Sequence, residues 1–231
     1  WNRARKTLVS TTTGIAQQEG LLNINNKVSQ YLGNGWTSEP LEKENLITPR
    51  HLLTMTSGLN DESNWVIKSN LTYLADAGTR WSYSNVFQKL IDVVAASSNQ
   101  TFENYFNAKL KNKIGMDGFW NFGTIFTIYH SNTRSMARFG LLFLNKGKWK
   151  NEQIINETYL NEAISTSQNI NPSYGYLWWL NGKSKYMVPG SQTVYPTALV
   201  PNAPADMYAA MGAEDQRIYV IPSKNMVVIR M

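Results

Sequence analysis

The sequence contains no cysteine, which excludes disulfide bonds, thiolate nucleophiles and cysteine-ligated zinc. It has only two histidines, His51 and His130, whereas a zinc site needs three or four ligands, so we expect no metal or other cofactor. No apolar run is long enough to cross a bilayer. What remains is a chain of 231 residues, 42% of them hydrophobic and 12% aromatic, which is ample to bury a core.

The charge balance is basic, with 22 lysines and arginines against 16 acidic residues and a net charge of +6. The basic residues are scattered along the chain. A nucleic-acid-binding protein usually shows a denser basic stripe with interleaved aromatic residues. We therefore expect a solvated basic surface and no nucleic-acid partner.

The first twenty residues predict a helix. Leu8, Ile15 and Ala16 recur at helical spacing over residues 3–20, and Gly20 stands where a left-handed residue would end the helix. Lys6 is unusual in the first turn, because the positive end of the helix dipole repels a cation. Burial there would lower the pKa of the amine and let its neutral form accept a proton, which makes Lys6 a candidate general base.

Further along the chain, helical patterns give way to strand patterns. The helical segments are 47–58 (with Thr48 as N-cap and Gly58 as stop), 86–96, 101–114 (with Thr101 as cap), 132–144 and 156–165. His51 lies beside two leucines, so we expect a structural role for it. Residues 60–80 form either the rim of a site or a plain surface loop. The strand segments are 174–180, 206–211, 216–221 and 226–231, with Asn181-Gly182 as a hairpin-type turn.

Helices followed by an antiparallel meander predict an α+β fold. A tyrosine and an asparagine, Tyr83 and Asn85, directly precede the 86–96 helix. Together with Lys6 and the segments 47–59 and 132–144, this Tyr-x-Asn pair resembles the serine β-lactamase and penicillin-binding-protein family, in its branch of class C β-lactamase-related hydrolases. The resemblance implies an antiparallel sheet flanked by helices plus an all-helical lobe.

Carried over to the whole chain, the resemblance implies one domain over residues 1–231, with the helical lobe at about 25–170 and the sheet strands at about 174–231. The chain looks truncated at both ends relative to the family. A periplasmic or secreted location is also implied by the resemblance, although no signal peptide is seen in this sequence.

The family's roles fall on particular residues here. The resemblance makes Lys6 the general base, Tyr83 a proton relay and Asn85 a positioning residue, and it places the oxyanion hole at the backbone N–H groups of residues 3 and 216. The chemistry is reasonable, since a phenol relays protons and an amide both donates and accepts hydrogen bonds. A structural alternative is that Tyr83 and an N-cap Asn85 simply finish a turn.

Two departures stand against catalysis. The family's Ser-x-x-Lys motif falls on Arg3-Ala4-Arg5-Lys6, so an arginine, which cannot be a nucleophile, replaces the serine. The family's third motif, a cation and a glycine, falls on Ala213, Glu214 and Asp215, which supply neither. The N–H of Gln216 remains a possible oxyanion donor, and Arg217 a possible source of the cation.

Three hypotheses follow for the function. The first is a β-lactamase-related serine hydrolase, which cleaves an ester or amide through an acyl-enzyme, or a degenerate member that lacks the nucleophile. The second is a non-catalytic protein that binds a peptide or cell-wall fragment in the same cleft and holds a carboxylate with Arg3. The third is a structural module. If Arg3 is genuine, the binding protein is favoured. If the start of the sequence is truncated or misread, the enzyme is favoured. In either case we expect the ligand to be a small molecule or a peptide-like compound.

Overall fold

The computed structural model describes residues 1–213 and 215–231, apart from the side chains of Asn2 and Arg3. Its helices and turns are η1 (Asn2–Arg5), α1 (Lys6–Gln18), α2 (Ser29–Leu32), α3 (Leu41–Glu44), α4 (Pro49–Leu53), η2 (Lys68–Asn70), η3 (Asn85–Gln88), α5 (Lys89–Ser98), α6 (Phe102–Phe106), η4 (Asn107–Lys111), α7 (Thr133–Leu144), α8 (Glu157–Ala163) and η5 (Pro222–Lys224). Its strands are β1 (Phe119–Asn121), β2 (Ile128–His130), β3 (Lys148–Trp149), β4 (Glu152–Gln153), β5 (Trp179–Leu180), β6 (Tyr208–Met211), β7 (Arg217–Ile221) and β8 (Met226–Arg230).

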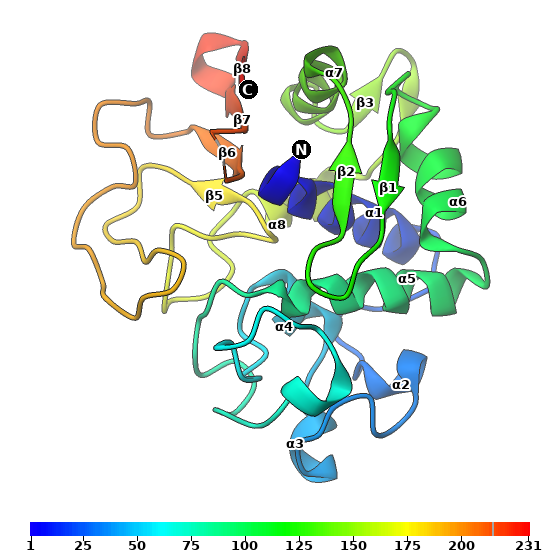
Figure 1. Cartoon of the computed structure of the whole chain (residues 1–231). Helices are drawn as coiled ribbons and strands as arrows, with labels where there is room; N and C mark the ends of the chain where they lie inside the picture. The colour runs from blue at the N-terminus through cyan, green and yellow to red at the C-terminus, as the bar shows by residue number, and fades with distance from the viewer. Residues whose placement is uncertain (214) are drawn as a thin grey trace.

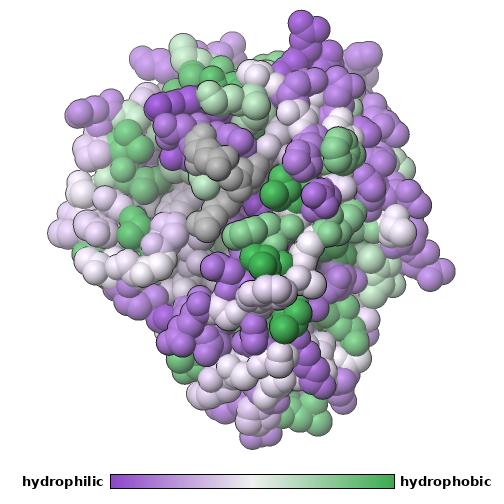
Figure 2. All heavy atoms as spheres, in the orientation of Figure 1, coloured by the Kyte–Doolittle hydropathy of each residue, from purple (hydrophilic) through white to green (hydrophobic). Residues whose placement is uncertain are grey.

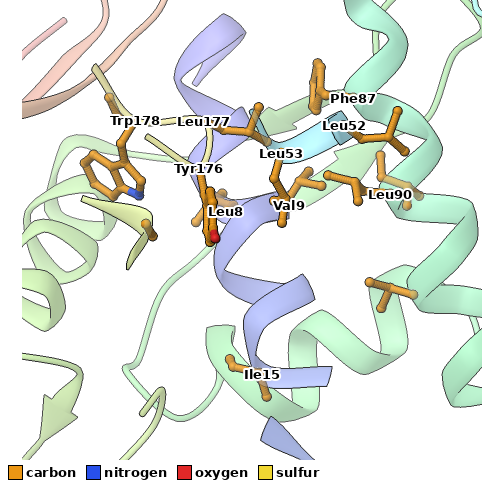
Figure 3. Packing of buried hydrophobic residues seen from close by; sticks show 14 of the residues in the cluster. Leu8, Val9, Ile15, Leu52, Leu53, Phe87, Leu90, Tyr176, Leu177 and Trp178 are labelled. Carbon is orange, nitrogen blue, oxygen red and sulfur yellow. The ribbon is translucent and has the colours of Figure 1, made fainter. Parts of the chain in front are cut away.

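Helix α1 runs through the middle of the molecule, with the sheet strands on one side and α5 and α6 on the other (Figure 1). Every residue from Lys6 to Ala16 is buried. Leu8 and Val9 lie among apolar side chains of α4, α5 and the segment before β5, and Ile15 belongs to the same core (Figure 3). A helix buried on all its faces must satisfy its own polar groups, since no water reaches them.

The threonines of α1 solve this problem within the helix. Each hydroxyl donates to a carbonyl of the preceding turn, at 2.9 Å from Thr7 to Ala4, 2.8 Å from Thr11 to Thr7, 2.7 Å from Thr12 to Leu8 and 2.9 Å from Thr13 to Val9. A polar sequence therefore sits in the core without leaving these hydroxyls unsatisfied.

Both ends of α1 can be compared with the prediction. At its end, Gly20 has φ 74° and its N–H donates to Gln17 O at 2.9 Å, while Leu21 N–H donates to Ala16 O at 3.0 Å. This pair of bonds defines a Schellman stop, so the predicted glycine terminator is confirmed. The start of the predicted helix is wrong, because residues 2–5 form a tighter 3₁₀ turn and the α-helix begins at Lys6.

A four-stranded antiparallel sheet with the order β5-β6-β7-β8 forms the other layer. Helix α7 packs on β7 and β8 through a buried face that includes Met136, Phe139 and Phe143, at the i, i+3, i+7 spacing of an amphipathic helix. Where α7 comes closest to the sheet, a Cβ on Gly140 would lie 2.5 Å from a methyl group of Val227. The predicted α+β fold and the meander of its last three strands are confirmed.

Several local predictions are wrong. The helix capped by Thr48 ends at Leu53 and not at Gly58, because Met55 adopts a left-handed φ of 59° and turns the chain away. The cap itself is confirmed, and His51 completes it by accepting a hydrogen bond from Thr48 N–H at 3.1 Å. Two short antiparallel hairpins, β1–β2 and β3–β4, also lie between the helices of residues 25–170. Packing between aromatic side chains holds the two strands of the first hairpin together. Strands of three residues are too short to give a clear strand pattern in the sequence.

The predicted hairpin turn at Asn181-Gly182 is wrong as well. Strand β5 contains only Trp179 and Leu180, and its partner β6 follows a long loop, residues 181–207. Asn181 organises this loop with its side chain. Its Nδ2 donates to the carbonyls of Val200, Ala203 and Pro204 at 3.0, 3.2 and 3.0 Å, and its Oδ1 accepts from Val200 N–H at 2.9 Å.

None of the helices in the described part of the chain is long and apolar enough to span a membrane. Hydrophilic and hydrophobic residues are interspersed over the face shown in Figure 2, in keeping with the scattered charges of the sequence.

The contact between α1 and α8 gives a test of this packing. A Cβ on Gly14 would lie 2.3 Å from the Tyr159 ring, whose hydroxyl donates to Ser10 O at 2.9 Å. We predict that Gly14→Ala lowers the free energy of unfolding by about 1–3 kcal/mol, because the ring has to move out of its position. Urea denaturation measures the change. In a Tyr159→Ala background the penalty should vanish, and alanine should become the better residue by its helix propensity. The same penalty in both backgrounds would show that the ring is not its cause.

Glu39 gives a test by pH. Burial, and then the nearby carboxylate of Glu44, raise its pKa from the ordinary 4.5 to about 7. The folded state therefore holds this proton more tightly than the unfolded state, so the stability that protonated Glu39 contributes is complete below the unfolded pKa and is lost as the pH rises to about 7. Glu39→Gln should match the parent at pH 4 and exceed it at pH 8 by about 1–2 kcal/mol, once screening at a half-buried group is allowed for. Urea titrations at both pH values check this, with exposed Glu42→Gln as the control that should show no such gain.

Candidate functional site

Lys6 and Tyr83 are in contact. The side chain of Lys6 is buried at the start of α1, and its Nζ lies 4.4 Å from the ring centroid of Tyr83 and 4.4 Å from that of Phe87. Two residues that the Tyr-x-Asn and lysine motifs singled out thus meet in space. A cation held this close to two ring faces gains cation–π attraction.

An aromatic cluster fixes the position of Tyr83. Its ring stacks on Trp179 of β5 with centroids 5.6 Å apart, and it packs edge-on against Tyr174 at 6.2 Å. Trp81 meets the same two rings at 6.1 Å and 5.4 Å. Burial raises the pKa of Tyr174 well above its usual value, so its hydroxyl stays neutral. The cluster joins the segment before η3 to the first strand of the sheet.

Two pockets meet at Tyr83. The first, which we name the apolar pocket, has a volume of about 270 Å³, and its walls include Tyr83, Trp179, Val188, Leu199, Met211 and Ala213, with Arg217 among its lining residues. The second, which we name the polar pocket, has a volume of about 600 Å³ and is lined by Asp61, Glu62, Arg80, Ser82, Tyr83 and Gln192 among others. The loop 60–80 therefore forms part of the rim of the polar pocket. The two pockets share Tyr83 and have chemically different linings, and we refer to them together as the cleft.

Asn85 has a set of contacts that the sequence did not predict. Its side chain is buried, and Nδ2 donates to the backbone carbonyls of Asn64 at 3.2 Å and Ile125 at 3.0 Å. The alternative in which Asn85 caps the turn is wrong, because Ser84 is the N-cap and its hydroxyl accepts from Val86 N–H at 3.4 Å. Asn85 thus ties the rim loop and the β1–β2 loop to η3, and its role toward a substrate stays a prediction.

The segment of the third motif lies at the turn between β6 and β7. Ala213 lines the apolar pocket together with Tyr83. Gln216 closes the turn, since its carbonyl accepts from Gly212 N–H at 2.8 Å, and it is not among the described residues that line the two pockets. Glu214 lies outside the described residues, as does the side chain of Arg3. The proposed oxyanion donors at residues 3 and 216 therefore stay predictions.

Arg217 does bring a cation to the apolar pocket. Its guanidinium donates to the Gly212 carbonyl and, at 3.4 Å, to Asp215, whose closer partner is Arg230 at 2.8 Å. No group of three or more potential metal-ligating side chains gathers anywhere in residues 1–213 and 215–231. Trp179, Leu199 and Met211 were missed by sequence reasoning, because ordinary apolar residues give no signal until the fold places them at a pocket.

This chain resembles known proteins in both sequence and fold. The family model described as beta-lactamase matches residues 4–231. The chain belongs to the β-lactamase family. A search of curated protein sequences finds no significant match.

Solved structures share the β-lactamase fold at low sequence identity. A proposed β-lactamase from Bacteroides dorei has a TM-score of 0.73 at 14% identity, with 100% of this chain and 77% of that chain covered. A proposed 6-aminohexanoate-dimer hydrolase from Bacillus anthracis gives 0.73 at 15%, with 99% and 65% covered. A class C β-lactamase gives 0.70 at 16%, with 99% and 74% covered. The chain therefore has the fold of β-lactamase-family hydrolases and spans about two thirds to three quarters of their length.

The contacts of Asn85 predict that it stabilises the fold, whether or not it takes part in catalysis. Asn85→Ala should lower the free energy of unfolding by about 1–2 kcal/mol, because it removes two hydrogen bonds that a buried amide makes. Asn85→Asp should cost at least as much, since a carboxylate keeps the shape but has no N–H to donate. Urea denaturation of both variants measures these losses. Unchanged stability in both would mean that the amide does not hold the two loops.

Proposed function

We propose that this cleft is a hydrolase-type active site that has lost its serine nucleophile, so that the chain binds an ester- or amide-bearing small molecule or peptide without cleaving it. The observation that carries the proposal is the contact between Lys6 and Tyr83 at the junction of two pockets, combined with an arginine at position 3. The binding half of the machinery is present and the attacking group is absent.

The chemistry of acyl transfer explains why position 3 decides. A serine one helical turn before the lysine would attack the acyl carbon once the amine had taken its proton. A guanidinium stays charged and cannot attack. In the well-studied subtilisin example, loss of the serine removes about six orders of magnitude in rate.

A working serine hydrolase is the second candidate. It is favoured by the retention of Lys6 in contact with Tyr83, and it needs another serine within reach. Ser10 does not meet this need, since its hydroxyl lies 3.4 Å from that of Tyr159 in the core. Ser82 lines the polar pocket beside Tyr83 and is the serine to examine.

The test restores the missing group. The parent, Arg3→Ser and the double variant Arg3→Ser/Lys6→Ala are incubated with p-nitrophenyl acetate and with a fluorescent penicillin. We expect no burst and no covalent adduct in the parent. Arg3→Ser should release p-nitrophenol at least about a hundredfold faster than the parent and carry an acyl adduct at residue 3, since it regains part of what a nucleophile supplies. The double variant should lose this gain, because no base remains.

Intact-mass spectrometry with peptide mapping locates any adduct. An adduct on Ser82 in the parent would establish the working hydrolase and overturn the proposal. A folded Arg3→Ser protein that forms no adduct and hydrolyses nothing would show that the loss extends beyond the nucleophile. Circular dichroism on all three proteins confirms that they are folded.

A further inference from the structure

We infer that the apolar pocket selects the ligand by an uncharged acyl or aryl group of up to about nine non-hydrogen atoms, and that the loop 181–207 is the element that sets this limit. The inference rests on the proposed function, because it names the ligand class of the same cleft. It adds a size limit, a polarity and a positioning residue, none of which the motif residues supply.

The walls of the pocket are apolar on most sides. The stacked rings of Tyr83 and Trp179 form one wall, and the side chains of Leu199 and Met211 pack against the core beside them. Arg217 is the charged residue among those that line the pocket, and its guanidinium is already engaged by Gly212 and Asp215. A charge placed among the apolar walls, away from Arg217, would lose its hydration without gaining a new partner. The pocket therefore favours a neutral apolar group.

The volume sets the size of that group. About 270 Å³ corresponds to roughly nine times the 30 Å³ that one water molecule occupies in the liquid. An octanoyl group, with eight carbons and one oxygen, matches this count. Each methylene that enters should tighten binding about fourfold, and methylenes beyond the limit should add nothing.

The other half of the cleft suits a polar remainder. Asp61 and Arg80 of the polar pocket form an ion pair at 2.9 Å, and Ser82 and Gln192 line the same space. Gln192 also donates to Trp81 O at 3.0 Å, so the loop 181–207 reaches both pockets. A molecule with an apolar acyl group on one side of an amide and a polar part on the other fits both halves.

The loop is held in place before any ligand arrives. Asn181 makes its four contacts to residues 200–204, and Tyr186 and Tyr195 exchange backbone hydrogen bonds and stack with centroids 5.0 Å apart. Loops of this length in compact domains usually serve a function, and a preformed wall avoids the cost of ordering it on binding. Asn181 is therefore a positioning residue for the pocket, although it does not line it.

The experiment is a chain-length series on the parent protein. N-acetyl-, N-hexanoyl-, N-octanoyl- and N-dodecanoyl-glycinamide are titrated below their micelle-forming concentrations, with calorimetry as the readout. We expect affinity to rise by about fourfold per methylene up to octanoyl and then to level off or fall. A rise that continues at the same slope to dodecanoyl would overturn the inference, because it would mean that the apolar pocket does not limit the length of the bound group.

Two variants and one control locate the limit. Leu199→Trp fills the pocket, so the plateau should move to shorter chains while the acetyl compound binds as before. Leu46→Trp, at a residue that is 52% exposed and outside both pockets, should leave the series unchanged. Asn181→Ala should flatten the slope per methylene without weakening acetyl binding, since it releases the wall only. If that variant does not fold, Leu199→Trp alone decides.

The outcomes separate the two proposals. If no member of the series binds to the folded parent, the proposed function fails. If all members bind with equal affinity, the cleft binds amides and only the present inference fails. A plateau that stays at octanoyl in Leu199→Trp would likewise place the apolar group elsewhere.

Discussion

The burial of α1 is the constraint on which the rest of the structure depends. Each face of this helix meets another element, including α5, α8 and η4, so none of its positions is free to change size. Tyr159 lies against Gly14 because no other residue leaves room for the ring. A helix enclosed in this way cannot shift along its axis without breaking several contacts at once, which fixes the position of its first residue, Lys6.

From this fixed point, the site is assembled by aromatic side chains more than by polar contacts. Tyr83 and Phe87 meet the side-chain nitrogen of Lys6, and Trp179 of the sheet stacks on Tyr83. Ring stacks of this kind are stiff and well packed, so they fix the position of the sheet relative to α1. The cleft lies where these stacked rings reach the surface. The rings of Tyr83 and Trp179 also form one wall of the apolar pocket.

The sequence could predict whatever depends on neighbouring residues in the chain. Thr48 and Thr101 were identified as N-caps, Gly20 as a helix stop and the last three strands as a meander, because each has a local chemical cause. The loop 181–207 could not be predicted, since Asn181-Gly182 has the composition of a hairpin turn and only the distant carbonyls of residues 200–204 show what Asn181 does. The pockets were equally hidden, because their walls come from several separate stretches of the chain that consist mostly of ordinary residues.

The same contacts change what the motif residues say about function. Asn85 holds two loops, Tyr83 belongs to an aromatic cluster and Lys6 fills a buried space between rings, so each has a packing reason to be present whether or not the chain catalyses anything. The motif residues are therefore weak evidence for turnover. The two pockets are better evidence for binding than the motif residues are for turnover. The packing of α1 does not require a pocket beside Tyr83, so packing alone does not explain why the pockets are there.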